Sequence, residues 1–267
     1  MFDEFKALVR EDFEELSQTG TLRRARELSS DTQVFESEQF PQYFTGRLDA
    51  NVVLIHLNPG KMSAAYPARW QSFEDYFDFH EHFGRRCYGK GSPRGKKGYK
   101  SRFDWRQLAF LKQLGVINFL EERTEDDRYT NLETSIDEKL QLELIPYRSD
   151  RFDASALPPA ELAPYLERIL ELIARSHRDF VLFCGSVFET ILRSATSDRL
   201  NVECIKTCKF NLKKRDGNLT RNAARFANVS IEFDGRSIRA GIAHSYAQQG
   251  LPAEEYGKQV RALYDRN

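Results

Sequence analysis

The feature that most constrains the fold is an apolar run at residues 52–55 that stops soon afterwards at Asn58-Pro59-Gly60. An unbroken apolar run is typical of a strand buried on both faces, as in a parallel sheet covered by helices. Pro59 lacks the amide hydrogen that a ladder needs, and Gly60 permits backbone angles that other residues resist. The strand should therefore end near Asn58, which places its amide at the carboxyl edge of the sheet, where open α/β folds bind ligands.

The rest of the chain alternates predicted strands and helices. Strands are expected at residues 140–145 and 180–184, and helices follow them at about 159–176 and 187–193. The other predicted elements are two helices within residues 1–28, a helix at 104–114 with Asp104 as its N-cap and Gly115 as its end, strands within 202–242 with an Asp234-Gly235 hairpin, and a helix at 252–264. This alternation predicts a single α/β domain over residues 1–267, a three-layer α/β/α sandwich with a central, mainly parallel sheet.

Composition restricts the environment of the protein. The 40 basic and 40 acidic residues cancel, so net charge indicates no polyanionic partner. The four cysteines are too few for a disulfide scaffold and show no zinc-finger spacing. No signal peptide and no run of about 18 apolar residues is present. We therefore expect a cytoplasmic monomer with reduced thiols, no metal or other cofactor, and no membrane partner.

The distribution of charge is less even than the total. Residues 85–102 hold eight Lys or Arg, four Gly and no acid, a composition that predicts a flexible basic insert. A solvated loop is the simplest interpretation, and contact with DNA phosphates is the functional one. The acidic segment at 121–138 can then lie on the far side of the molecule. The candidate phosphate-binding residues of the insert are Arg85, Arg86, Lys90, Arg94, Lys96, Lys97 and Lys100.

Polar or glycine-bearing loops follow the predicted strands. They are Asn58-Pro59-Gly60, residues 146–149, Gly185-Ser186 and His244-Ser245. Taken alone, the first is an ordinary turn, Gly185-Ser186 is a strand-to-helix turn, and a lone histidine is more often structural than catalytic. Because parallel strands end at one edge of a sheet, we expect these loops to meet there.

This combination resembles the uracil-DNA glycosylase superfamily, most closely its mismatch-specific branch. The strand with Gly-Ile-Asn-Pro-Gly of that branch is matched by residues 56–60, His-Leu-Asn-Pro-Gly. A second motif near the C-terminus, a His or Asn followed by Pro-Ser, is matched loosely by Ala243-His244-Ser245, where either of the first two residues occupies the histidine position. The resemblance spans about residues 50–250 and implies hydrolysis of an N-glycosidic bond in DNA after base flipping.

The resemblance also implies roles for individual residues. Asn58 would orient the attacking water, and His244 or Ser245 would contact the base oxygen or a flanking phosphate. Because an amide is a poor base, excision should be slow unless the leaving base is good or another group, such as Glu143 or Asp104, assists. The residues that would complete the site are Pro59 and Gly60 in the pocket, Tyr66 or alternatively Trp70 stacked on the base, Gln248 or Gln249 in the gap left by the flipped nucleotide, and Arg148 and Ser186 on the DNA.

Gly60 bears on the substrate. In the main uracil branch a Tyr at the matching position excludes bases with a C5 substituent, and a glycine leaves that space open. The expected substrate is a modified or C5-substituted pyrimidine. Its extreme form is a hypermodified phage cytosine, whose removal to leave an abasic site would serve antiviral defence rather than DNA repair.

Three other functions compete with this interpretation. A non-enzymatic DNA-binding module would use the basic segments alone, and a nuclease would use Asp104, Glu143 and a divalent metal. A nucleotide-binding fold at Gly185-Ser186 lacks any G-x-G-x-x-G or P-loop pattern. The cysteine spacing does not match that of the iron–sulfur glycosylases, so we expect no cluster.

Overall fold

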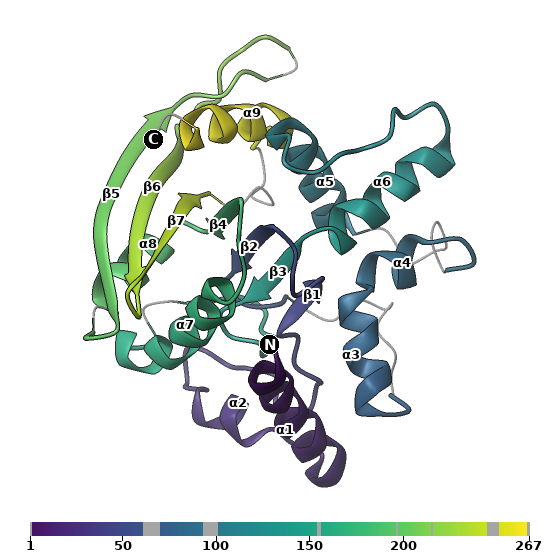
Figure 1. The fold of residues 1–267 in the computed structure, drawn as a ribbon, viewed down its shortest axis with the longest axis vertical. Helices are drawn as coiled ribbons and strands as arrows, with labels where there is room; N and C mark the ends of the chain where they lie inside the picture. The colour runs from purple at the N-terminus through teal and green to yellow at the C-terminus, as the bar shows by residue number, and fades with distance from the viewer. Residues whose placement is uncertain are drawn as a thin grey trace.

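The structure, a computed structural model, describes residues 2–60, 70–92, 101–153, 156–195, 197–214, 216–244 and 251–265. Within these ranges the strands form one seven-stranded sheet in the order β1-β3-β2-β4-β7-β6-β5. Helices cover both faces of the sheet (Figure 1). No described helix is both long enough and apolar enough to cross a membrane.

The described elements follow one another along the chain as α1 (Asp3–Thr19), α2 (Arg23–Glu27), β1 (Phe44–Gly46), β2 (Val52–His56), α3 (Phe73–Glu81), α4 (Phe83–Tyr88), α5 (Arg102–Leu114), α6 (Glu125–Asp137), β3 (Leu140–Glu143), α7 (Pro159–Ala174), β4 (Phe180–Cys184), α8 (Phe188–Ser194), β5 (Leu200–Phe210), β6 (Ala224–Phe233), β7 (Arg236–Ala243) and α9 (Ala253–Tyr264).

The centre of the sheet is parallel. Strands β3, β2, β4 and β7 are neighbours that run in one direction, whereas β1, β6 and β5 add antiparallel edges. The predicted α/β sandwich is therefore confirmed. Beyond β2 the backbone of Ile145 still donates to the carbonyl of Leu57, at 2.9 Å, so pairing stops just before Asn58 as expected. The carboxyl ends of the four parallel strands consequently share one edge.

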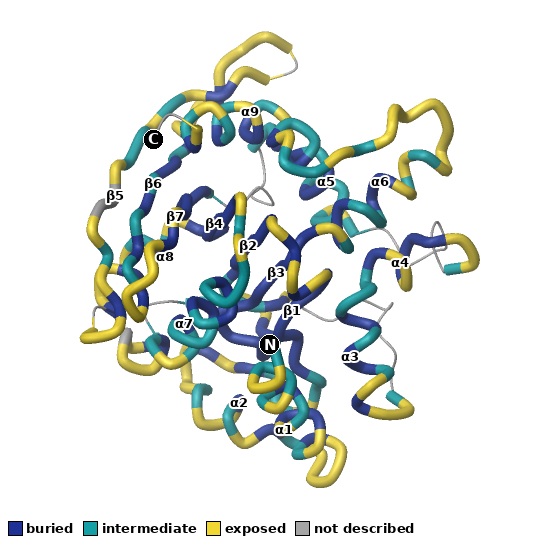
Figure 2. The backbone as a smooth tube through the Cα atoms, in the orientation of Figure 1, coloured by how far each residue is buried: buried dark blue, intermediate teal, exposed yellow. Residues whose placement is uncertain are grey.

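Two apolar layers hold the sheet between the helices. Alternate residues of β2 face opposite sides, with Val53 and Ile55 packed in the layer that includes α1 and α7, and Val52 and Leu54 packed against α5 and α9. In Figure 2 strands β3, β2 and β4 are buried along their whole length. Burial on both faces explains why the sequence of β2 is continuously apolar.

The ends of several helices are set by single residues. Gly20 has φ 75° and ends α1, and Gly115 has φ 69° and ends α5 as predicted. The predicted N-cap of α5 is wrong: Ser101 caps the helix by accepting from the backbone N–H of Asp104, at 3.1 Å. Asp104 thus lies in the first turn, where a carboxylate interacts favourably with the helix dipole.

The basic insert is not a loop throughout. Its first residues belong to α4, in which Cys87 and Tyr88 are 2 % and 1 % exposed, because they pack into the apolar cluster formed with α5 and α6. The acidic helix α6 does not lie on the far side either. Its Asp137 accepts from the backbone N–H groups of Gly84 and Arg85, at 2.7 and 2.8 Å, so acidic and basic segments are neighbours.

The C-terminal strands are longer than predicted. The turn between β6 and β7 has positive φ at both Asp234 (48°) and Gly235 (73°), as expected for a two-residue hairpin. Strand β5 pairs with β6 from Leu200 to Phe210. The connection between them forms a second hairpin, which projects past α9 (Figure 1).

Candidate functional site

The amide of Asn58 is fixed through its nitrogen. Nδ2 donates to Ser149 Oγ at 2.7 Å, to the carbonyl of Pro59 at 2.9 Å and to that of Tyr147 at 3.4 Å. Because these acceptors occupy the NH₂ group, they define which amide atom is oxygen. Oδ1 has no partner within the described ranges, and the side chain is half buried. The oxygen is therefore free to accept a hydrogen bond from a water or a substrate.

The loop after β3 supports this geometry. Ser149 Oγ donates to the carbonyl of Arg151 at 2.9 Å while accepting from Asn58, and its backbone N–H donates to Pro59 at 3.3 Å. Arg148 is 3 % exposed and donates to the carbonyl of Gly60 at 3.1 Å and to Gln42 at 3.0 Å. Because Arg148 is buried, the predicted contact between Arg148 and DNA is wrong. Arg148 instead joins the loop after β3 to the Asn-Pro-Gly turn.

A buried row of polar side chains runs along β3. Lys139 Nζ donates to Gln141 Oε1 at 3.2 Å, and Gln141 Nε2 donates to Glu143 Oε1 at 2.8 Å. Gln107 of α5 also donates to Gln141 Oε1, at 2.9 Å. Apolar and polar residues alternate in the sequence of β3, yet all of these polar side chains are buried, at 0 to 6 % exposure. We call Lys139, Gln141 and Glu143 the polar ladder.

Glu143 ends the ladder at the carboxyl edge. It is the register partner of His56, two residues before Asn58, so both side chains lie on the α5 face. Burial raises the pKa of Glu143 to about 8, although Gln141, Arg148 and Lys139 oppose the shift. Its Oε2 is buried without a hydrogen-bond partner in the described structure. A neutral carboxyl group, able to donate, is the consequence near pH 7.

The neighbouring titratable groups are held in defined states. Burial lowers the pKa of His56 to about 3, so its ring is neutral, and it packs edge-on against Phe103 with 5.4 Å between ring centroids. Burial lowers the pKa of Lys139 to about 8, while Asp104 and other acids raise it. Asp104 itself accepts from Tyr88 OH at 2.5 Å, and burial raises its pKa.

His244 follows β7 at the same edge. Its backbone N–H donates to Tyr256 OH, at 2.6 Å, and that hydroxyl donates to the carbonyl of Arg225 at 2.6 Å. The side chain is partly buried, and burial followed by the charge of Arg225 lowers its pKa. Of the other loop residues, Ser186 is exposed after β4. The carboxyl edge thus brings together Asn58, Glu143, Ser186 and His244.

Gly60 lies at the exposed end of the Asn-Pro-Gly turn. Its φ is not positive, so the backbone does not require glycine there. A Cβ added at Gly60 would meet no described atom within 4 Å. The missing side chain therefore leaves open space beside Pro59, which is itself buried.

The basic candidates in the insert differ in availability. Arg86 is ion-paired with Asp75 at 2.9 Å and lies over the ring of Phe79. Arg85 and Lys90 are exposed and form no ion pair with described residues. The remaining predicted contacts fall outside the described residues, and these are Tyr66, Arg94, Lys96, Lys97, Lys100, Ser245, Gln248 and Gln249. Trp70, the alternative to Tyr66, packs edge-on against Tyr76 and Phe79 with centroids 5.3 and 4.9 Å away.

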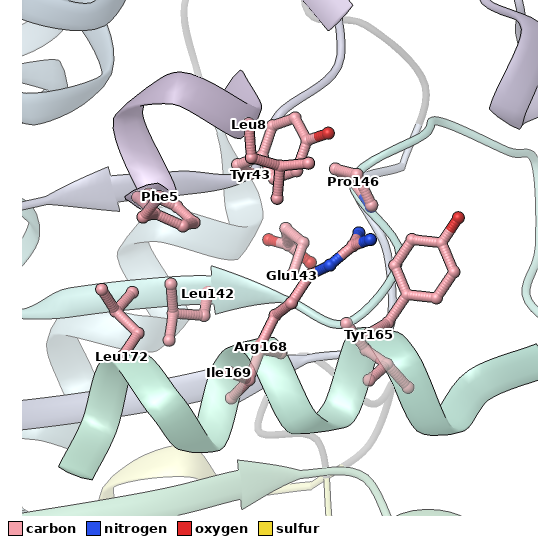
Figure 3. Close-up of a pocket in the computed structure, with 11 residues that line it drawn as sticks. Phe5, Leu8, Tyr43, Leu142, Glu143, Pro146, Tyr165, Arg168, Ile169 and Leu172 are labelled. Atoms are coloured by element: carbon pink, nitrogen blue, oxygen red, sulfur yellow. The ribbon is translucent and has the colours of Figure 1, made fainter. Parts of the chain in front are cut away.

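The cavity drawn in Figure 3 is small, and Glu143 is the one residue of the candidate site among those that line it. It lies between α1, α7 and β3 and is lined mainly by apolar side chains, including Leu8 and Ile169 (Figure 3). Its volume of about 20 Å³ accommodates roughly one water molecule. We therefore assign no substrate to it.

Several residues of the site are absent from the sequence-based prediction. Ser149, Gln141 and Lys139 were not candidates, although a histidine within the β2 run and polar residues at alternate positions of β3 were detectable signals. Gln141 and Lys139 are buried because α5 covers β3, and no local sequence pattern predicts that packing. No protein-family model and no curated protein matches the sequence.

Proposed function

We propose that this protein is a DNA glycosylase that hydrolyses the N-glycosidic bond of a flipped pyrimidine nucleotide and leaves an abasic site. The observation that carries the proposal is the Asn58 amide, whose nitrogen is held by Ser149 and two carbonyls while Oδ1 remains available. Such an oxygen orients a water by accepting its hydrogen bond. The water oxygen then bonds to the sugar carbon as the bond to the base breaks, the proton that the water loses passes to solvent, and the base leaves with the bonding electron pair and takes up a proton.

Glu143 supports the second half of the reaction. The base leaves with the electron pair of the glycosidic bond, so a donor near it lowers the barrier. A carboxyl group that stays protonated near pH 7 provides such a donor, and the pKa of Glu143 is raised to about 8. His244, neutral because its pKa is lowered, would contact the base oxygen through a ring N–H.

The open space at Gly60 supports a modified substrate. A C5 substituent of a pyrimidine needs room that a large side chain at this position would occupy, and a Cβ there meets no described atom within 4 Å. Modified or C5-substituted pyrimidines are therefore the proposed substrates, with hypermodified phage cytosine, and hence antiviral defence, as the extreme case.

The test is a panel of duplexes that contain uracil, a thymine mismatch, or 5-hydroxymethylcytosine with and without a sugar. Alkali-labile strand breaks report abasic sites. We expect breaks on at least one modified duplex, and their absence on every substrate would reject the enzyme. A protein that binds the duplexes without forming abasic sites would instead be a DNA-binding module. Gly60→Tyr, as the matched variant, should lose the bulkiest substrates first.

A further inference from the structure

The hairpin between β5 and β6 carries positive charge that the proposed chemistry does not use. We define the basic arm as residues 209–214 and 216–223. Its base is ordered: the backbone N–H groups of Leu212 and Thr220 donate to Thr220 Oγ1 and the Leu212 carbonyl, at 3.0 and 2.7 Å. Leu212 is fully buried, and most of the remainder is exposed (Figure 2). Hydrogen bonds thus define the base of the arm, and the exposed remainder projects from the surface.

The cations of the arm differ from many others in the protein. Several arginines elsewhere are paired with acids, as Arg47 is with Asp49 at 3.1 Å. In contrast, the exposed cations of the arm form no ion pair with any described carboxylate, and these are Lys209, Lys213, Lys214 and Arg221. The one described acid of the arm, Asp216, accepts from the backbone N–H of Asn218 at 3.0 Å. Exposed cations without an ion-pair partner on a projecting hairpin fit a polyanion.

A groove adjoins the arm. Lys213 and Lys214 line it on one side, Trp105 and Arg106 of α5 on another, and the first turns of α9, including Lys258, close it. Its volume is about 560 Å³. Two acids, Glu254 and Glu255, also line it, so cations outnumber acids. Trp105 packs edge-on against Tyr129 with 5.9 Å between ring centroids, so the groove offers mainly its positive charge to a phosphate backbone.

Leu219 adds an apolar contact to the charged one. It is 63 % exposed, and it is the antiparallel partner of Lys213, so the two side chains lie on one face of the arm. Exposed leucines beside cations contact sugars and base steps in proteins that grip duplex DNA.

We infer that the basic arm and its groove bind the sugar–phosphate backbone of duplex DNA beside the candidate site. The position supports this partner, because Phe226 near the base of the arm is the register partner of Ala243, which precedes His244. The choice of DNA rather than another polyanion rests on the proposed function. Lys213, Lys214 and Arg221 contact phosphates, and Leu219 contacts the groove between them.

The test is anisotropy of a short fluorescein-labelled duplex, measured with wild-type protein and variants across a salt series. Lys213→Glu and Lys214→Glu should each weaken binding about 10-fold and lower the slope of log affinity against log salt by about 1, as loss of a phosphate contact does. Leu219→Ala should weaken binding without changing the slope. Arg26→Glu is the matched control, because Arg26 is exposed and unpaired on α2, remote from the arm.

The thermal midpoint of unfolding checks that each variant is folded. Because these side chains are exposed, we expect the midpoint to be unchanged. Unchanged affinity and slope for both lysine variants would overturn the inference, as would tighter binding of RNA than of duplex DNA through the arm. The two proposals fail separately. Arm-dependent binding without abasic sites rejects the glycosylase alone, whereas unaltered binding with abasic sites rejects the arm alone.

Discussion

At the scale of single residues, Asn58 can orient water but cannot remove a proton from it. Ser149 and backbone carbonyls accept hydrogen bonds from the amide nitrogen, so the orientation of Oδ1 is fixed. An amide does not act as a base at neutral pH. Turnover should therefore depend on positioning more than on proton transfer.

We expect Asn58→Ala to lower the rate of base excision by about 100-fold or more, the usual range for loss of a group that acts on the nucleophile. Duplex affinity should stay within the range of the wild type. Asn58→Asp, which adds a base, should excise faster than Asn58→Ala. Single-turnover kinetics measure both, and an unchanged rate in Asn58→Ala would remove the assigned role. Ser149→Ala should produce an intermediate loss because two carbonyl acceptors remain.

Glu143 makes stability depend on pH. Its pKa is about 8 in the folded protein and 4.5 ordinarily, so between these values the folded state holds a proton that the unfolded chain has released. The contribution of Glu143 to the free energy of unfolding should then fall as pH rises, by up to about 1.4 kcal/mol per pH unit, while the buried His56 contributes the opposite slope below pH 6.5. Glu143→Gln removes this dependence. Urea unfolding from pH 5 to 8 measures it, and parallel curves for the two proteins would contradict the shift.

Sequence patterns predict the place of this site better than its contacts. Asn58 is located because a buried run ends beside a proline, which is local information. Arg148 is misassigned because an arginine in a loop resembles a DNA contact until Gln42 and Gly60 are known to surround it. Burial by residues distant in sequence decides such roles.

At the scale of elements, α1 anchors the loop that holds Asn58. Asp12 is 1 % exposed and accepts from Tyr43 OH at 2.6 Å and Tyr147 OH at 2.8 Å, and Arg24 donates to it at 3.2 Å. Tyr147 precedes Arg148 and Ser149. One carboxylate thus ties the N-terminal helices to the carboxyl edge of the sheet.

We expect Asp12→Ala to lower the free energy of unfolding by about 3 kcal/mol, because it leaves two buried hydroxyls without their acceptor, whereas Arg24 keeps its ion pair with Glu11. Asp12→Asn, which keeps one oxygen, should lose less. Glu14→Ala on the exposed face of α1 is the control and should cost below about 0.5 kcal/mol. Denaturant titration compares the three, and equal losses for Asp12→Ala and Glu14→Ala would show that the contact contributes nothing.

The elements themselves were largely predictable. Helix α7 and strand β4 follow from periodicity, which each segment carries alone. Strand β1 has three residues, too few to show alternation, and was missed. The cap of α5 was misplaced because Ser101 and Asp104 are both suitable polar residues three positions apart.

At the scale of the molecule, the charges sum to zero, but their pairing is uneven. Asp137 of α6 accepts hydrogen bonds from the backbone of α4, whereas the exposed cations of the basic arm form no ion pair with a described carboxylate. In the described ranges no three His, Cys, Asp or Glu side chains are grouped as a metal site requires. The proposed reaction uses water, an amide and a neutral carboxyl group.

We therefore expect abasic sites to form at an undiminished rate in excess EDTA. The alkali-labile strand-break assay with and without chelator measures this. Loss of activity in EDTA that Mg²⁺ restores would favour the nuclease, and strand breaks without alkali would do the same. A matched reaction with added Mg²⁺ alone controls for effects of the ion on the duplex.

The polar ladder has a consequence for how the chain folds. Side chains alternate along a strand, so a slip of β3 by one position would move Lys139 and Glu143 into the apolar layer under α1 and α7. Two unsatisfied ionisable groups there would cost several kcal/mol. The ladder thus excludes pairings of β3 that are shifted by one residue between β1 and β2. Tyr147 and Ser149 reach Asn58 in the observed pairing, so a buried row of polar side chains helps to align the site.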